Sequence, residues 1–353
     1  MQAPMKPVIT INGGSSGIKC SCHETLGGLS LFCSGAIKNK GGQDPVFEVQ
    51  YAGEDKKPMP VAGKGNHEVQ VLAGWLRTNM PSPLAVAHRV VYGSDFASPC
   101  PIDAALLQQL EDLVDRDPQH LPAELSMIKL FMSVFPTATH LACFDTAFHR
   151  HMPGLATLVP LPRLYRDKGI RRYGFHGLSY TYLLQELERR NGKGTADGKL
   201  VLAHLGSGAS LAAVNHGRCQ DTSMGFTPAA GLPMRTRTGD LDPGIAEFLI
   251  RTENMDAAKF RKLTNEESGL LGISGTTGDM QQLLERGATD PAARLAVDYF
   301  CYQVKKWIGA YAAALEGLET LVFSGGIGQI FVPNFDYLYC LLTQHAPQGN
   351  HQL

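Results

Sequence analysis

Three glycine-rich segments each follow a short apolar run, and their composition suits the binding of phosphate. They lie in PVITINGGSSGIK (7–19), LVLAHLGSGASLAAV (200–214) and ETLVFSGGIGQI (319–330). Glycine permits unusual backbone angles and lets a ligand approach the main chain closely. Such a backbone can point several N–H groups at an anion, and phosphate is the usual ligand. Each segment alone is also compatible with a tight turn, but three in one chain favour a phosphate-binding site.

The glycine segments match neither of two common nucleotide-binding motifs. The chain contains no GxxxxGK[ST] sequence and no GxGxxG fingerprint placed between a strand and a helix. We therefore expect a nucleotide site of another architecture.

The elements that must position these segments alternate between strands and helices. The first two glycine segments pass from one apolar strand into another, which predicts the opening hairpins of two related domains facing one cleft. Helices are predicted over residues 104–114, 178–190 and 291–318, and Asp242–Pro243 predicts an N-cap and a first helical residue. This alternation indicates an α/β fold. Residues 33–68, rich in glycine and lysine, are predicted to form exposed hairpins without chemistry.

Composition limits the functions that these elements can serve. A chain of 353 residues that is 44% hydrophobic can bury a large core and favours two domains. Lys and Arg number 32 against 33 Asp and Glu, so there is no basic excess for nucleic acid or an anionic membrane. No apolar run reaches the roughly 20 residues of a membrane span, and the first residues lack a secretory signal. Eight cysteines without a CxxC pair predict reduced thiols, and hence a cytoplasmic protein.

Eight segments, in order, give the chain a resemblance to the acetate kinase family, whose members phosphorylate acetate, propionate or butyrate. They are VITINGGSSGIK, AHRVVYGS, FDTAFHRHMP, GIRRYGFHGLSY, AHLGSGASLAAVNHGRCQDTSMGFTP, GLPMRTRTGDLDPGI, SGLLGISGTTGDM and LVFSGGIG. The resemblance covers residues 7–329. It implies the actin/sugar-kinase-like (ribonuclease H-like) fold, with duplicated domains around a nucleotide cleft. The N-terminal domain would span residues 1–148, and the C-terminal, nucleotide-binding domain would span residues 149–353.

The resemblance also implies a reaction. Family members transfer the γ-phosphoryl group of ATP to the carboxylate of a short fatty acid, or run the reverse reaction from an acyl phosphate. Such a transfer needs in-line positioning and cationic groups around the equatorial oxygens. The expected enzyme is therefore an acetate kinase that uses ATP with Mg²⁺, or Mn²⁺ in its place. We also expect a cytoplasmic homodimer that binds neither nucleic acid nor membrane.

Residue by residue, the resemblance assigns roles by position. Catalytic positions are Asp145, His176 and Arg237, and substrate-binding positions are Arg89, Val91, Phe175 and Pro228. ATP-binding positions are Lys19, His204, Leu205, Gly206, Ser207, Gly208, Asp279, Met280, Gln281, Gly325, Gly326, Ile327, Gly328 and Gln329, and the metal position is Asn12. An arginine fork suits a carboxylate or a phosphoryl group. Taken singly, Arg89 or Arg237 could instead form a surface salt bridge, and His176 could instead make a structural hydrogen bond.

Asp145 matches the catalytic aspartate of the family, which is commonly assigned as a proton donor or acceptor. The acceptor carboxylate resembles a side-chain carboxyl of pKa about 4, so at neutral pH it carries no proton to remove. We expect Asp145 instead to orient the acceptor or to bind Mg²⁺ through water.

Several positions depart from the family pattern. Gly17 replaces a hydroxyl residue, and Ser207 stands where many members have an asparagine. Gln281 replaces an arginine and Gln329 replaces a glutamate. Leu178 and Tyr180 replace the threonine and the last histidine of the family's HGTSH. Residues 115–125 only faintly resemble the family's APLHNPxNL. After Gln329 the chain has no counterpart of a metal-binding glutamate or of a last helix, which predicts weaker metal binding and uncovered apolar surface on the first domain.

Two alternative functions stay open at this point. One is a propionate or butyrate kinase, because one methylene in an apolar pocket changes binding by only about 1–3 kcal/mol. The other is a truncated, catalytically weak nucleotide-binding homologue. An actin-like or chaperone-like ATPase is disfavoured, because the segments around Arg89, Asp145, His176 and Arg237 belong to acyl phosphorylation.

Overall fold

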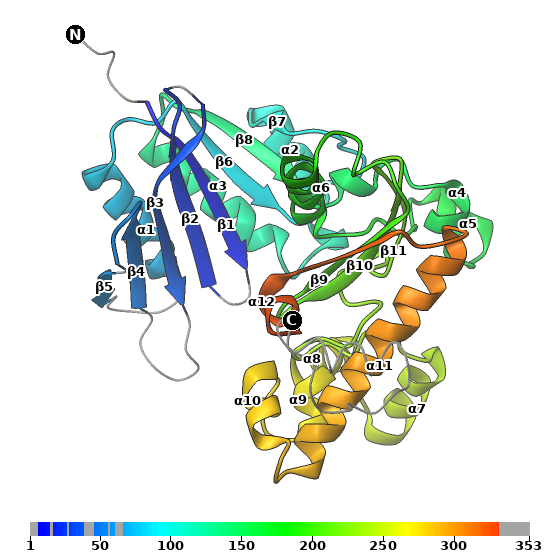
Figure 1. Cartoon of the computed structure of the whole chain (residues 1–353). Coiled ribbons are helices and arrows are strands. Elements are labelled where there is room, and N and C mark those ends of the chain that lie inside the picture. Colours follow the sequence, from blue (N-terminus) through cyan, green and yellow to red (C-terminus); the bar gives the residue numbers. More distant parts are fainter. Residues whose placement is uncertain are drawn as a thin grey trace. The chain divides into compact units, whose positions relative to one another are not determined.

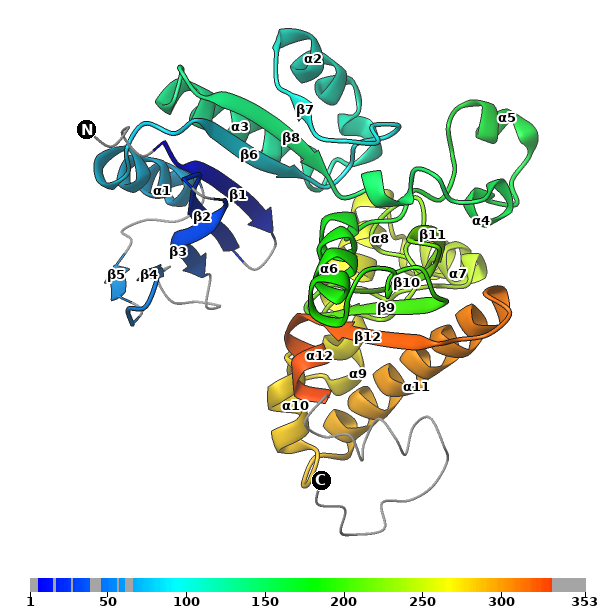
Figure 2. The same ribbon diagram turned by 45° about the horizontal axis from the view of Figure 1, so that its top comes forward.

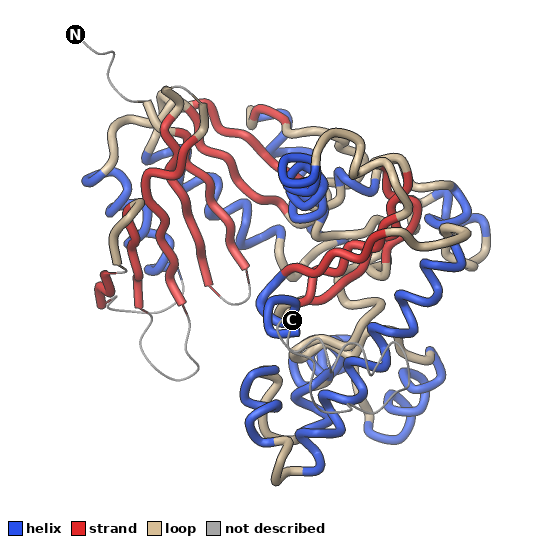
Figure 3. Tube along the Cα trace, viewed as in Figure 1, coloured by secondary structure: helices blue, strands red, loops and turns tan. Residues whose placement is uncertain are grey.

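The computed structural model describes residues 6–14, 17–26, 28–38, 46–55, 57–60 and 66–331. The chain divides into two compact units, Met1–Ala147 and Phe148–Leu353 (Figure 1). Strands flanked by helices form the centre of each unit (Figure 3). The predicted α/β class is confirmed.

The first unit is built on a mixed sheet. Among the described residues its strand order is β5-β4-β3-β2-β1-β6-β8-β7. The strands are β1 Val8–Gly14, β2 Gly17–Glu24, β3 Ser30–Lys38, β4 Val46–Tyr51, β5 Lys57–Pro60, β6 Ala85–Val90, β7 Cys100–Pro101 and β8 Thr139–Phe144. β1 is antiparallel to β2 and parallel to β6, which is parallel to β8. The carboxyl ends of β1, β6 and β8 therefore lie at one edge of the sheet.

The helices of the first unit pack on this sheet and close its core. They are α1 Asn66–Asn79, α2 Ala104–Asp112, η1 Val114–Arg116 and α3 Leu121–Val134, and η2 Ala147–His149 follows at the junction of the two units. The alternating burial of β1 places Ile9 and Ile11 in one core cluster with Leu72 of α1 and Phe131 of α3. Figure 2 shows α1 and α3 on the same side of the sheet.

The hairpins predicted over residues 33–68 are confirmed for β3 and β4, which pair antiparallel, but the prediction that they are exposed is wrong. Ile37 and Phe47, each 1% exposed, belong to the core of the first unit. Apolar residues at every second position give both strands one buried face. The glycines and lysines between them drew the prediction toward turns. Residues 39–45 and 61–65 lie outside the described part of the chain.

The second unit has its own sheet between two long helices. In its described part the strand order is β11-β10-β9-β12. The strands are β9 Leu200–Leu205, β10 Ala209–Asn215, β11 Arg218–Thr222 and β12 Thr320–Ser324. β9 is antiparallel to β10 and parallel to β12. Helix α6 (Gly177–Asn191) covers one face and α11 (Pro291–Ala314) the other (Figures 1 and 2).

Shorter helices complete the second unit. They are α4 Gly154–Thr157, α5 Arg163–Asp167, α7 Pro243–Glu253, α8 Ala257–Lys262, η3 Leu263–Glu267, α9 Gly269–Ser274, α10 Met280–Arg286 and α12 Gly325–Phe331. Helices are confirmed within the three predicted segments, although α11 ends four residues early, at Ala314. The predicted start of α7 is also confirmed, because the Asp242 carboxylate accepts the N–H of Gly244 at 2.7 Å.

The third glycine segment differs from its prediction as a loop. Gly325 turns the chain directly from β12 into α12, with φ +80°. A Cβ at Gly325 would lie 2.4 Å from the carbonyl oxygen of Leu205, so the close approach of the two strand ends requires glycine. Within the described residues, no helix has the length and apolarity that a membrane crossing demands.

Candidate active site

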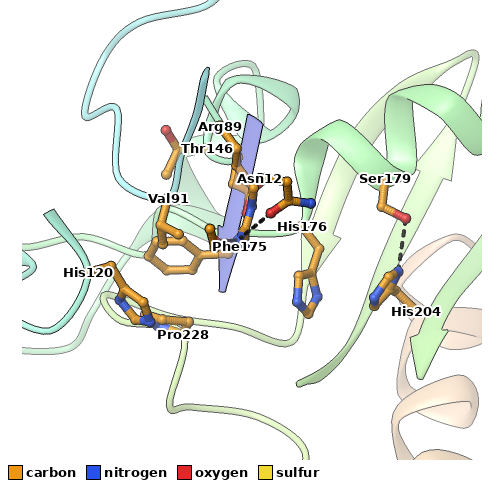
Figure 4. Close-up of polar contacts among 12 residues, drawn as sticks. Asn12, Arg89, Val91, His120, Thr146, Phe175, His176, Ser179, His204 and Pro228 are labelled. Carbon is orange, nitrogen blue, oxygen red and sulfur yellow. Dashed lines mark hydrogen bonds and ion pairs between the residues drawn. The ribbon is translucent and has the colours of Figure 1, made fainter. Parts of the chain in front are cut away.

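In the first unit, Arg89 and Asp145 form an ion pair at the carboxyl edge of the sheet. The Asp145 Oδ2 atom accepts from Nη2 of Arg89 at 2.6 Å and from its Nε at 2.9 Å. Nη1 of Arg89 donates to the carbonyl of Gly13 at 3.0 Å and to Oδ1 of Asn12 at 3.3 Å (Figure 4). Burial alone would lower the pKa of the Arg89 guanidinium, but the Asp145 carboxylate outweighs burial and the pKa is raised. The guanidinium therefore stays charged.

This ion pair follows from strand order. Arg89 is near the end of β6, Asp145 directly follows β8, and Asn12 is near the end of β1, so parallel pairing places the three side by side. A guanidinium has five N–H donors, and the contacts of Arg89 described above use four. One N–H of Nη2 remains for a ligand.

Glu124 of α3 holds the segment that follows Arg89. Its carboxyl oxygens lie 3.1 and 3.3 Å from the backbone N–H of Val91, which they accept, and Glu124 is 5% exposed. Burial raises the pKa of this carboxyl to about 8, although the Val91 N–H and Arg89 act in the opposite direction. Glu124 is therefore mainly uncharged at neutral pH. Nearby, Thr146 Oγ1 accepts the N–H of Gly93 at 3.1 Å.

Sequence reasoning missed Glu124, although a pattern could have found it. It lies on the buried stripe of α3 with Leu121, Leu125 and Ile128, at helical spacing. A carboxyl on such a stripe must find a hydrogen-bond partner or lose its charge.

The metal prediction finds limited support among the described residues. The side chains of Asn12 and Lys19 are exposed, and the two residues pair in register across β1 and β2. No group of three His, Cys, Asp or Glu side chains in the described part of the chain is placed to hold a metal. Mg²⁺ commonly binds one or two protein oxygens together with substrate phosphates and water. The donors present, Asn12 Oδ1 and the paired Asp145 carboxylate, fit only a metal that is held mainly by the nucleotide.

In the second unit, two of the predicted nucleotide segments meet at one edge of the sheet. Residues 206–208 follow β9, and the N–H of Gly206 donates to the carbonyl of Gly208 at 3.1 Å. Ser324, the last residue of β12, is level with His204 of the parallel strand β9. The segments 204–208 and 325–328 are therefore neighbours.

Two imidazoles and a guanidinium face the glycine segment. A Cβ built on Gly208 would lie 3.4 Å from Nε2 of His176 and 3.8 Å from Nη1 of Arg237. One built on Gly206 would lie 3.8 Å from Nε2 of His204. The rings of His176 and His204 are 4.4 Å apart between centroids (Figure 4). Glycine thus leaves free the space beside these donors.

Each imidazole is held through its other nitrogen. Nδ1 of His176 lies 2.8 Å from Oγ of Ser210. Nδ1 of His204 lies 2.9 Å from Oγ of Ser179, as Figure 4 shows. His176 adopts φ +62°, a left-handed conformation that costs a residue with a side chain about 1 kcal/mol or more. His149, fully buried, hydrogen-bonds the carbonyl of Phe175 with Nε2 at 2.9 Å and so fixes the residue before the strained one. Sequence reasoning assigned no role to His149.

Arg237 and the predicted adenosine segment are tied to the same edge by main-chain contacts. Nη1 of Arg237 donates to the carbonyl of Pro228 at 3.2 Å. The N–H of Arg235 donates to the carbonyl of Ser207 at 3.2 Å, and a Cβ on Gly278 would lie 2.2 Å from the Arg235 carbonyl. The segment around Arg235 therefore connects the glycine segment to the start of α10.

The other predicted residues take varied positions. Asp279 caps α10 by accepting the N–H of Gln282 at 3.1 Å, and Gln281 is exposed and donates to Glu285 at 3.2 Å. The buried residues among the rest are Val91, Phe175, Pro228, Leu205, Met280, Ile327 and Gly328, whereas Gly326 and Gln329 are exposed. Val91 belongs to the first unit, and Phe175 and Pro228 belong to the second.

Comparison with known proteins identifies relatives of the chain. Residues 7–332 match the model of the acetokinase family. The chain is 39% identical over 330 residues to an acetate kinase of Rhodopseudomonas palustris (strain TIE-1), covering 91% of this chain and 82% of that protein. It is 38% identical over 340 residues to acetate kinase 1 of Lactococcus lactis, covering 93% and 85%.

Solved structures agree with the sequence relatives. An acetate kinase of Porphyromonas gingivalis superposes with a TM-score of 0.80 at 31% identity, covering 93% of this chain and 86% of that one. A propionate kinase of Francisella tularensis superposes with a TM-score of 0.86 at 29% identity, covering 96% and 88%. The resemblance predicted from the eight segments is confirmed, and with it the fold class.

Proposed function

Because the chain belongs to the acetokinase family, we propose that it transfers the γ-phosphoryl group of ATP reversibly to acetate, giving ADP and acetyl phosphate. One observation carries the proposal within the second unit. Nε2 of His176 and Nη1 of Arg237 both face Gly208, beside a segment whose bare main chain suits phosphate. A phosphoryl group there would have a hydrogen-bond donor and a positive charge beside it.

The proposed reaction is an in-line displacement. A carboxylate oxygen of acetate forms a bond to the γ-phosphorus while the bond from phosphorus to the bridging β-oxygen breaks, and ADP leaves with that electron pair. Charge spreads over the three equatorial oxygens during the transfer, so fixed donors stabilise the transition state more than the ground state. We assign this stabilisation to Arg237 and His176.

Arg89 is proposed to bind the acceptor carboxylate, and Asp145 to hold Arg89. Asp145 occupies the Nε edge of the guanidinium, and one N–H of Nη2 remains available. Acetate is ionised at neutral pH, so the reaction needs no general base. An uncharged Glu124 beside Val91 also avoids placing a second negative charge near the acceptor.

The metal is proposed to be Mg²⁺, with Mn²⁺ able to replace it. When bound, it would offset the negative charge of the nucleotide phosphates. Asn12 and Asp145 are the oxygen donors that this chain would direct toward it.

For the acyl group, the proposal relies on the resemblance, which assigns Val91, Phe175 and Pro228 to substrate binding. Acetate and propionate differ by one methylene, which corresponds to about 1–3 kcal/mol in an apolar site. The preference for one acid is therefore given by the ratio of the kcat/KM values for acetate and propionate. Propionate is the main competing substrate, because a propionate kinase is among the similar structures.

A hydroxamate assay of acyl phosphate formation tests the proposal. Wild type with ATP and Mg²⁺ should form acetyl hydroxamate, with a higher kcat/KM for acetate than for propionate or butyrate. Arg89→Ala should lose most of this activity. Arg163→Ala is the matched control, because Arg163 is 82% exposed and only loosely paired with Asp167 at 3.8 Å. Wild-type turnover no higher than that of Arg89→Ala would contradict the proposed reaction.

Two further properties are proposed from the family resemblance. We infer a homodimer, to which the exposed leucines Leu155, Leu158, Leu161 and Leu164 around α4 and α5 could contribute an apolar surface. Light scattering of the purified chain would test it, and a monomer at micromolar concentration would contradict it. We also infer a cytoplasmic location, which cell fractionation would test.

A further inference from the structure

A buried chain of hydroxyl groups ends on the imidazole of His176. Oγ of Ser210 lies 2.8 Å from Nδ1 of His176 and also hydrogen-bonds the hydroxyl of Tyr180. Ser210 and Tyr180 are both 0% exposed. The Nε2 atom on the other side of the ring faces Gly208. The chain of hydroxyls and the glycine segment therefore approach opposite sides of one imidazole.

The fold builds this arrangement from one helix and one strand. His176 and Tyr180 stand one turn apart at the start of α6, where the N–H of Tyr180 donates to the carbonyl of His176 at 3.1 Å. Ser210 comes from β10, in register with His204 of β9. Side chains four residues apart lie on the same face of a helix, so Ser210 can contact both.

The acidities of the groups decide the direction of the hydrogen bonds. A phenol is a stronger acid than an alcohol, so Tyr180 is the better donor to Ser210. The neutral imidazole nitrogen is a stronger acceptor than a phenol oxygen, so the single Ser210 proton goes to Nδ1. Each hydrogen bond then also strengthens the next one in the chain. A ring that accepts at Nδ1 carries its proton at Nε2.

We propose that Tyr180 and Ser210 are positioning residues that hold His176 as the Nε2–H tautomer, with this donor directed toward the phosphoryl group beside Gly208. The identity of the ligand rests on the proposed function, whereas the tautomer does not. In this proposal, Tyr180 contacts neither the γ-phosphorus nor the acceptor oxygen and acts only through Ser210.

The neighbouring imidazole gives an internal comparison. His204 Nδ1 lies near two serine hydroxyls, Ser179 at 2.9 Å and Ser324 at 3.4 Å, and no tyrosine is among these contacts. Removing the Tyr180 hydroxyl should therefore change the tautomer of His176 and leave that of His204 unchanged.

Nitrogen NMR of the full chain labelled with ¹⁵N-histidine measures the tautomer directly. In wild type, we expect His176 to show a protonated Nε2 and an unprotonated Nδ1. In Tyr180→Phe, the Nδ1–H form should become populated. The kcat for acetyl phosphate formation should fall about tenfold, as for the loss of one hydrogen bond, while the KM for ATP stays within about twofold. Ser210→Ala should give at least the same loss, and the double variant should add little to it.

Tyr311→Phe is the matched control. Tyr311 is 1% exposed, and its hydroxyl has no hydrogen-bond partner within the described residues, so it should change neither tautomer nor kcat. An Nδ1–H tautomer of His176 in wild type would overturn the proposal. So would a Tyr180→Phe variant that keeps both the wild-type spectrum and kcat. If wild type formed no acyl phosphate, the proposed function would fail, but the spectra would still decide the role of Tyr180.

Discussion

Replacing Glu124 by glutamine isolates the cost of placing a carboxyl behind the predicted acceptor site. Glutamine is nearly isosteric, and its carbonyl oxygen can still accept the backbone N–H of Val91, which now lies 3.1 Å from a Glu124 oxygen. The substitution removes the ionisable group and little else. Any pH-dependent difference between the two proteins therefore reports on Glu124.

The magnitude follows from the pKa of this carboxyl, which burial raises from 4.5 to about 8. Below pH 4.5 the group is protonated in the folded and unfolded chains and costs nothing. As the pH rises from 4.5 toward 8, the unfolded chain ionises while the folded chain holds its proton. Wild type then loses about 1.4 kcal/mol per pH unit from this group, or about 3 kcal/mol in all at pH 7.

The assay is denaturant or thermal unfolding of wild type and Glu124→Gln at pH 5, 6, 7 and 8. The variant should be more stable by less than about 1 kcal/mol at pH 5 and by about 3 kcal/mol at pH 7. This corresponds to a rise in the unfolding temperature of the first unit of about 6–12 °C. Glu111→Gln is the matched control, because Glu111 is 39% exposed in a surface pair with Lys129. A stability difference that stays constant from pH 5 to pH 8 would refute the reasoning.

Three other outcomes test separate parts of the account. Asp145→Asn should lower kcat about 100-fold at saturating Mg²⁺, because it weakens the charged contact that fixes the acceptor-binding arginine; near-normal turnover would remove that role. Gly208→Ala should lower kcat/KM for ATP about tenfold, because the new methyl group would lie 3.4 Å from Nε2 of His176. Gly309→Ala is the control, because nothing lies within 4 Å of its new methyl group, and it should leave kcat/KM for ATP unchanged. Burial raises the pKa of the Cys20 thiol to about 12, so mass spectrometry should find it unmodified by a thiol reagent at pH 8 until the chain is unfolded; rapid modification of the native chain would contradict this burial.

The sequence predicts the local elements of this chain well, because local rules determine them. Asp242 before Pro243 marks the start of α7, since an aspartate cap and a proline at the first helical position act within one turn. The apolar spacing of α11 likewise predicts its long helix. The error over β3 and β4 has the opposite origin. The lysines and glycines of the turns indicated exposed segments. The apolar residues at alternate positions indicate a buried face only once β3 and β4 pair within the sheet.

The site is less accessible to sequence reasoning, because its supports come from distant segments. The resemblance supplied His176 by position, but Ser210 contacts it only because α6 packs on β10, 34 residues away along the chain. His149 supports Phe175 from 26 residues away and carries no motif of its own. Tyr180 is the exception, since its spacing of one helical turn from His176 was visible and only its partner was not.

The most direct measurement of the central claim is ³¹P NMR of the purified chain incubated with ATP, Mg²⁺ and acetate. We expect an acyl phosphate resonance that grows in step with ADP, and both should disappear when Arg237→Ala replaces wild type. Release of inorganic phosphate without acyl phosphate, or an equal rate in Arg237→Ala, would contradict the account.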